Sequence, residues 1–173
     1  ILAGKCKASV KDENRCDKTF WKAPQIKALL DAVPDERMII LDLATEIEPV
    51  WKRTQAFYGK PWIWNMLHNF GGNVSMFGRI ETVATAPYAA LMDDASGNMK
   101  GIGLTMEGIE QNPVLYELMT DHTWRTSAID LNTWLPEYIQ NRYGSKDPHA
   151  LKAWNVLRET VYNGKEIRDG AES

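Results

Sequence analysis

Carboxylates, amides and one imidazole follow three apolar runs of the chain, at the points where those runs end. The residues concerned are Asp42, Glu46, His68, Asn69, Asn73 and Glu107. Carboxylates can act as acid, base or nucleophile, amides can bind hydroxyl groups, and the seven tryptophans offer rings that pack on a pyranose. This set of side chains is typical of a site that acts on sugars.

Two of these residues, and the glycine pair that lies between Asn69 and Asn73, also have a purely structural interpretation, which the sequence leaves open. Asp42 could serve only as a cap or an ion-pair partner, and His68 could be a hydrogen-bonded loop histidine. The pair at 71–72 could simply be a turn that needs glycine. Glu107 is harder to explain structurally, because it directly follows an apolar strand and directly precedes a glycine.

The elements that would position these side chains alternate along the chain. Three short apolar runs predict strands of the buried, parallel type, at 38–43, 62–67 and 101–105. Helical spacing is found before, between and after them, at 23–33, 49–57, 74–88 and 109–122. The alternation predicts parallel α/β units, whose active sites form at the C-terminal ends of the strands. We take the rings of Trp62 and Trp64 to lie on opposite faces of their strand.

The pattern changes between 124 and 130, after which only helices are expected. We expect Thr133 to cap a helix that tolerates Pro136 in its first turn, and Asp147 with Pro148 to begin a last helix. The predicted domains are therefore 1–125, an α/β part whose residues 1–18 form an irregular lead-in, and 126–173, an all-α part.

Composition excludes several classes of function. The chain has 173 residues and a formal charge of −3, without a basic stripe, so we expect no nucleic-acid partner. No window approaches the roughly 20 apolar residues of a membrane span, so we expect no membrane partner.

Nucleotide-binding and serine-hydrolase motifs are absent, and Cys6 and Cys16 do not make a zinc site, so we expect no cofactor and no metal. The two cysteines could pair or remain free. The length also excludes a complete (β/α)₈ barrel, which takes about 250 residues.

Taken together, these residues resemble the alpha-N-acetylglucosaminidases, a family of glycoside hydrolases. The most specific match is the eight-residue block from Met66 to Asn73. Further matches lie at Ala32–Pro34, Ile40–Leu43, Glu46–Val50, Arg53–Thr54, Ile63–Trp64, Phe77–Gly78, Glu81, Glu107–Ile109, Gln111–Asn112, Trp124–Arg125, Arg142–Gly144 and Val161–Asn163. The resemblance covers roughly residues 20–163, in the order of the family.

The resemblance implies the second part of a (β/α)₈ catalytic barrel followed by the start of an all-α domain. It implies an exo-acting, configuration-retaining enzyme that removes terminal alpha-linked N-acetylglucosamine, as from heparan sulfate, in a secreted, periplasmic or lysosomal location. The nucleophile's role falls on Glu107. Positions in or near the sugar pocket match Leu43, Trp64 and Leu67, and we expect His68, Asn69 and Asn73 to join them as substrate-binding residues.

Two departures from the family pattern matter for activity. No Asn-Glu pair that could supply the acid/base glutamate is found in 1–18, and Asp12 stands where the family has a pocket tryptophan. We therefore expect the chain alone to be inactive, with its exposed sheet edge covered by the missing part of the same polypeptide or by another chain. The alternative is a non-catalytic piece that binds a carbohydrate or a partner.

Overall fold

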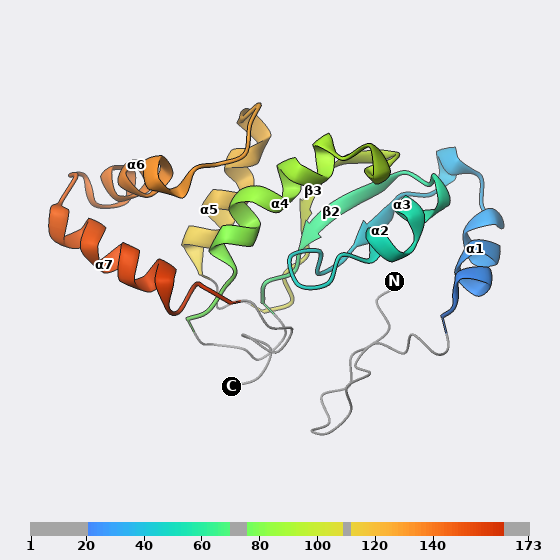
Figure 1. The fold of residues 1–173 in the computed structure, drawn as a ribbon, viewed down its shortest axis with the longest axis horizontal. Helices are drawn as coiled ribbons and strands as arrows, with labels where there is room; N and C mark the ends of the chain where they lie inside the picture. Colours follow the sequence, from blue (N-terminus) through green and yellow to red (C-terminus); the bar gives the residue numbers. More distant parts are fainter. Residues whose placement is uncertain (1–20, 70–75, 109–111, 165–173) are drawn as a thin grey trace, which may run out of the picture.

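The computed structural model describes residues 21–69, 76–108 and 112–164, and the statements below concern these residues. A three-stranded sheet lies at the centre, with helices packed on one face of it and further helices at one end (Figure 1). The elements are α1 (Ala23–Asp31), η1 (Asp35–Arg37), β1 (Ile40–Asp42), α2 (Val50–Arg53), α3 (Gln55–Tyr58), β2 (Trp62–Met66), α4 (Ile80–Met92), η2 (Asp94–Ser96), β3 (Met99–Leu104), α5 (Pro113–Asp121), η3 (His122–Trp124), α6 (Leu131–Tyr143) and α7 (Pro148–Glu159).

The sheet has the order β1-β2-β3, and both strand pairs are parallel. The three strands lie within a residue or two of the predicted runs, and among residues 126–164 only helices are found, so both predictions are confirmed. An isolated antiparallel bridge between Arg79 and Asn163 ties the chain after α7 to the residue before α4.

The two faces of the sheet differ sharply. The register sets Ile40 beside Trp62 and Asp42 beside Trp64, and all four side chains are buried. Leu41, on the other face of β1, is 44% exposed. The assignment of Trp62 and Trp64 to opposite faces is therefore wrong. Residues two apart in a strand share a face, and here both indoles face the helices.

The segment after α2 does not continue as the single helix expected over 49–57. Four consecutive residues of α3 have left-handed backbone, with φ between 50° at Gln55 and 55° at Tyr58, and Gly59 follows at 91°. Such backbone costs roughly 1–2 kcal/mol per non-glycine residue. Two contacts offset part of this cost: the Phe57 N–H donates to Thr54 Oγ1, and the Phe57 ring packs on Trp62 with centroids 5.8 Å apart.

The helix α4 continues through Pro87 to Met92, whereas a helix over 74–88 was expected. A proline inside a helix leaves the carbonyl four residues earlier without its helical donor. That carbonyl belongs to Val83, and the His122 ring donates to it from Nε2 at 2.7 Å. The next carbonyl, that of Ala84, accepts from the Ile129 N–H at 3.1 Å. The His122 ring thus supplies the donor that Pro87 removes, and the Ile129 N–H adds a second contact from the same segment after α5.

The helical part begins at Asp130, which caps α6 by accepting from the Asn132 N–H at 2.9 Å. The expectation that Thr133 is the cap is therefore wrong. Its hydroxyl instead donates to the Asp130 carbonyl, and Pro136 lies beyond the first turn. Asp147 caps α7 with Pro148 in the first turn, as predicted. The aromatic rings of Trp134, Tyr138, Trp154 and Tyr162 pack in succession, with centroids 5.1, 5.1 and 6.1 Å apart.

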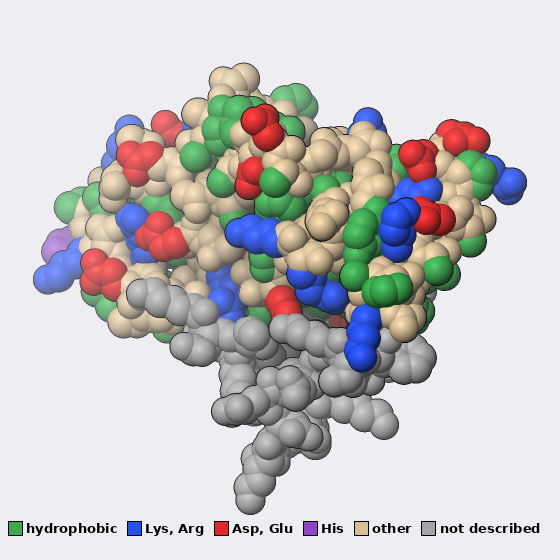
Figure 2. Space-filling view, turned by 45° about the vertical axis from the view of Figure 1, so that its right-hand side comes forward, with side chains coloured by type: hydrophobic (Ala, Val, Ile, Leu, Met, Phe, Trp, Pro, Cys, Tyr) green, Lys and Arg blue, Asp and Glu red, His purple; other side chains and the backbone are tan. Residues whose placement is uncertain are grey.

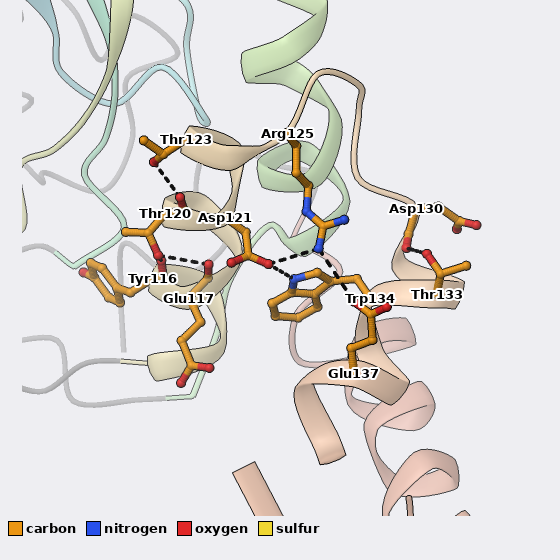
Figure 3. Close-up of polar contacts among 10 residues, drawn as sticks. All are labelled: Tyr116, Glu117, Thr120, Asp121, Thr123, Arg125, Asp130, Thr133, Trp134 and Glu137. Atoms are coloured by element: carbon orange, nitrogen blue, oxygen red, sulfur yellow. Dashed lines mark hydrogen bonds and ion pairs between the residues drawn. The ribbon is translucent and has the colours of Figure 1, made fainter. Parts of the chain in front are cut away.

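One polar cluster joins α5 to α6. Asp121 Oδ2 accepts from the Trp134 indole N–H at 2.6 Å and from Arg125 at 3.3 Å, and Arg125 also lies 3.7 Å from Glu137 (Figure 3). The face shown in Figure 2 carries acidic and basic side chains interspersed. Within the described ranges, no helix is both long and apolar enough to cross a membrane.

Candidate active site

Glu107 lies at the C-terminal end of the sheet, where β2 and β3 continue side by side past their last paired residues. The Thr105 N–H donates to the Met66 carbonyl at 3.0 Å, and the Glu107 N–H donates to the Asn69 carbonyl at 2.9 Å. The Glu107 side chain is exposed, whereas Asn69 is 1% exposed. The structure therefore brings Asn69 and Glu107 together, as predicted from their positions after neighbouring parallel strands.

Gly108 is required by this close approach. A Cβ at position 108 would collide with the Asn69 side-chain oxygen. The same holds five residues earlier, where a Cβ at Gly103 would collide with the Asn65 side-chain oxygen. Glycine at these two positions allows β3 and the residues after it to lie directly against Asn65, near the end of β2, and Asn69, which follows β2.

His68 is held by residues that follow it in the chain, on the segments before α4 and α5. Its ring stacks on Phe77 at 4.6 Å, and the Asn112 side-chain amide donates to its Nε2 at 3.1 Å. Asn112 in turn accepts from the Tyr162 hydroxyl at 3.0 Å. Burial lowers the pKa of His68 to about 4, so the imidazole is neutral at ordinary pH. This arrangement matches the structural interpretation of His68, namely a hydrogen-bonded loop histidine.

Asp42 also has the structural role that the sequence left open. Its carboxylate accepts from the Trp51 N–H at 3.0 Å and from the Val50 N–H at 3.4 Å, at the start of α2. Burial raises the pKa of Asp42 to about 6, against the lowering effect of these two hydrogen bonds. Asp42 is thus committed to capping the helix that follows β1.

The remaining predicted site residues are distributed over both faces of the sheet. Leu43 is half-buried and follows β1, and Leu67 is buried directly after β2. Trp64 borders a cavity of about 340 Å³ under α4, together with Trp51 and Ala90. Its indole therefore lies on the helix-covered face. Asn73 lies outside the described residues.

Glu46 lies at the same edge of the sheet, and the sequence had named it among the carboxylates without assigning it a role. It lies in the loop after β1, is 5% exposed, and its Oε1 accepts from the backbone N–H groups of Leu67 and His68 at 3.0 and 2.6 Å. Burial raises the pKa of Glu46 to about 7. No local pattern around residue 46 distinguishes it from the exposed glutamates, because its partners lie more than twenty residues away.

No group of three or more His, Cys, Asp or Glu side chains that could hold a metal ion is found among the residues that the structure places. The parallel strands, the carboxylate after the third strand and the buried polar groups beside it are the features of part of a (β/α) barrel, at the C-terminal ends of its strands. This class includes many glycoside hydrolases.

Comparison with known proteins identifies the family. Residues 13–126 match the family model of the alpha-N-acetylglucosaminidase (NAGLU) tim-barrel domain, and residues 134–173 match that of its C-terminal domain. The chain is 46% identical over 145 residues to the alpha-N-acetylglucosaminidase of Homo sapiens, covering 83% of this chain and 19% of that protein. The chain belongs to the alpha-N-acetylglucosaminidase family.

Solved structures of a Clostridium perfringens family 89 glycoside hydrolase share this fold. One, in complex with 2-acetamido-1,2-dideoxynojirmycin, superimposes with a TM-score of 0.75 at 38% identity, over 84% of this chain and 16% of that one. Another, with two glutamates replaced by glutamine, is in complex with its substrate GlcNAc-alpha-1,4-galactose, with a TM-score of 0.68 at 41% identity, over 74% of this chain and 14% of that one. The fold is thus the second part of a (β/α)₈ barrel followed by a helical segment. The chain spans about a fifth of the human relative and about a sixth of the bacterial one.

Proposed function

We propose that this chain is the nucleophile-bearing part of an exo-acting, retaining alpha-N-acetylglucosaminidase. The observation that carries the proposal is the placement of Glu107 at the C-terminal edge of the parallel sheet, its backbone bonded to Asn69. The named relatives support the substrate class, since the bacterial one is in complex with a GlcNAc-alpha-1,4-galactose substrate. The glycan partner would then end in alpha-linked N-acetylglucosamine, and we keep a secreted, periplasmic or lysosomal location as part of the proposal.

In this mechanism the Glu107 carboxylate attacks the anomeric carbon of the terminal sugar. The bond from that carbon to the glycosidic oxygen breaks, and a second carboxylic acid protonates the departing oxygen. The same group then removes a proton from water, which displaces Glu107 from the anomeric carbon and releases the sugar with its configuration retained.

The second carboxyl group must lie about 5–5.5 Å from the first in a retaining enzyme. Asp42 and Glu46 are both buried and bonded to backbone N–H groups, so neither is offered to a glycosidic oxygen. We therefore propose that the acid/base is supplied by the other part of the barrel, that the boundary of the helical domain lies near residue 126, and that these 173 residues alone do not hydrolyse glycosides.

The barrel-side face of the sheet supports this division of labour. Ile39 is 57% exposed and Leu41 is 44% exposed, although apolar side chains of an interior strand face are normally covered. A further length of barrel would cover them. The alternative, a non-catalytic carbohydrate- or partner-binding piece, would cover the same face with another chain. A native mass measurement separates the two, since only the alternative predicts a stable complex of the 173-residue chain with a separate partner.

The decisive test replaces Glu107 by Gln in the full-length protein, with the exposed Glu36→Gln as the control. The substitution keeps the size of the side chain and removes its charge, so turnover of a chromogenic alpha-N-acetylglucosaminide should fall by several orders of magnitude. The control should keep its turnover. A Glu107→Gln enzyme that keeps more than about a tenth of the activity, a loss of only ~1.4 kcal/mol of barrier stabilisation, removes Glu107 from the role.

A second variant tests the covalent step. In Glu107→Gly the vacated space can admit a small anion, so added azide should partly restore cleavage of an activated substrate. Azide would attack the anomeric carbon once and leave a product of beta configuration. Nuclear magnetic resonance of that product reads the configuration directly, and an alpha product would contradict attack from the face of Glu107.

A further inference from the structure

The glutamate in the loop after β1 joins the ends of all three strands. Glu46 Oε1 accepts two consecutive backbone N–H groups, those of Leu67 and His68, at 3.0 and 2.6 Å. These groups directly follow β2, which ends at Met66. They have left the strand ladder, they are buried, and a buried N–H without an acceptor costs about 1–3 kcal/mol.

The turn that Glu46 holds has strained backbone. His68 has a φ of 55°, in the left-handed region that a non-glycine residue occupies only at a cost of about 1–2 kcal/mol. The Asn69 N–H folds back onto the Leu67 carbonyl at 2.6 Å. Strained conformations of this kind persist where surrounding contacts over-determine them, and they concentrate at functional sites.

The turn at 67–69 also holds the backbone of Glu107. The Asn69 carbonyl, one residue after His68, accepts from the Glu107 N–H at 2.9 Å. A carboxylate in the first loop therefore fixes the second loop, and the second loop fixes the third. We propose that Glu46 is a positioning residue for Glu107, acting through the turn at 67–69. The proposal rests on the function proposed above only in taking Glu107 as the reacting group.

Several charged or titratable groups face Glu46 or share its cavity. They are Arg79 before α4, Tyr116 on α5, His68 after β2, Lys52 on α2 and Asp93 after α4. In the described part of the chain, Glu46 Oε2 makes no hydrogen bond. Burial outweighs the lowering effects of the backbone bonds and of Arg79, and raises the pKa of Glu46 to about 7. Because an ionised acceptor binds N–H groups more strongly than a neutral one, Glu46 should hold the turn more tightly above that pH.

The first experiment measures position without using activity. Amide hydrogen exchange is followed over 104–108 in the full-length protein for Glu46→Leu, Glu46→Gln and the exposed control Glu36→Gln. Leucine offers no acceptor, so exchange at the Glu107 amide should accelerate about tenfold or more, as expected when a backbone hydrogen bond is opened. Glutamine keeps an acceptor and should stay within about threefold of wild type, as should the control. Unchanged exchange in a folded Glu46→Leu protein overturns the proposal.

The second experiment measures the consequence for turnover. With a chromogenic alpha-N-acetylglucosaminide, Glu46→Leu should lower kcat about a hundredfold, with KM within about threefold, because a misplaced nucleophile affects the chemical step more than binding. If Glu46→Leu does not fold, Glu46→Gln decides. Glutamine stays neutral at every pH, whereas Glu46 ionises and then binds the two N–H groups more strongly. The ratio of wild-type to variant kcat should therefore rise about threefold or more between about pH 6 and pH 8. A flat ratio overturns the proposal.

The two proposals fail separately. If Glu107→Gln retains activity while Glu46→Leu still accelerates exchange at the Glu107 amide, the assignment of the nucleophile is wrong and the positioning role stands. If Glu107→Gln is inactive while the Glu46 variants leave both exchange and kcat unchanged, the nucleophile stands and the positioning role is wrong.

Discussion

The strand-end edge of the barrel part and the core of the helical part differ in the side chains that they bury. At the strand ends, Asp42, Glu46 and His68 are buried with shifted pKa values. In the helical part the core contains a succession of packed aromatic rings, stacked or edge-to-face, and the ion pair between Arg125 and Asp121 lies at its surface. Burying an ionisable group destabilises the folded state, while packing aromatic rings together stabilises it. We infer that the buried polar groups at the barrel edge lower the free energy of unfolding, while holding one another in a fixed arrangement. The packed rings of the helical part raise the free energy of unfolding.

The helical part also reaches into the barrel edge. Tyr162, which stacks on Trp154, donates to Asn112, which donates to His68. The Ile80 N–H donates to the Tyr162 carbonyl at 3.0 Å, and the Gly164 N–H to the Gly78 carbonyl at 2.9 Å. The two regions therefore form one packed unit in which the aromatic core supports the buried histidine.

The largest stability effect should come from the aromatic core. Trp134 is 3% exposed, stacks on Tyr138 and donates to Asp121, so Trp134→Ala should lower the free energy of unfolding by about 3–5 kcal/mol. Trp124 is 85% exposed, so Trp124→Ala serves as the control and should change little. Urea unfolding measures both. Equal losses in the two variants would mean that the helical part does not carry the stability assigned to it.

A smaller effect concerns the barrel edge, where burial of Glu46 should make the free energy of unfolding depend on pH. The pKa of Glu46 is raised by burial from 4.5 to about 7, so the folded chain holds a proton there that the unfolded chain releases. The stabilisation this gives is complete below about pH 4.5 and is lost as the pH rises through about 7, at ~1.4 kcal/mol per pKa unit. The free energy of unfolding of wild type minus that of Glu46→Gln should therefore decrease between these values.

The lowered pKa values of His68 and His122 act in the opposite direction on total stability, and they cancel in this difference because both proteins contain them. Glu36→Gln, on the surface, should show no such slope in the same comparison. A difference that is constant between about pH 4.5 and pH 7 would contradict the burial cost assigned to Glu46.

The smallest effect concerns the joint between the regions. His122→Ala removes the donor to the Val83 carbonyl that Pro87 leaves open, and should cost about 1–3 kcal/mol of unfolding free energy. In a Pro87→Ala background the new backbone N–H can bond to Val83, so the cost of His122→Ala should shrink by about 1 kcal/mol. A double-mutant cycle reads this coupling. Additive effects would show that His122 and Pro87 are independent.

Much of the barrel part was predictable because its signals are local. Short apolar runs predicted the three parallel strands, and the position of a carboxylate after the third run predicted where Glu107 would lie. The cap at Asp147 was predictable for the same reason, since the cap residue and the proline that follows it are neighbours in sequence. The sequence block from Met66 to Asn73 was specific enough to predict the family.

The errors arose where distant residues decide local structure. Pro87 indicates the end of a helix or a kink, and the His122 ring supplies from another segment the donor that lets α4 continue. The left-handed turn of α3 has no signal at Gln55, Ala56 or Tyr58, and depends on Phe57 packing against β2. The cap of α6 was misplaced by three residues, because Asp130 and Thr133 are both good capping residues.

The sequence alone established the order of strands and helices, the family, and the position of Glu107 directly after the third strand, because each depends on residues that are close together in the chain. The tertiary contacts, by contrast, decided that Asp42 accepts from the N–H groups at the start of α2, that the Asn112 amide donates to His68, and that Glu46 accepts from the two N–H groups that follow β2. The role of a polar group depends on which backbone groups reach it and on whether water is excluded. Both are set by segments separated by twenty or more residues, which no local pattern records.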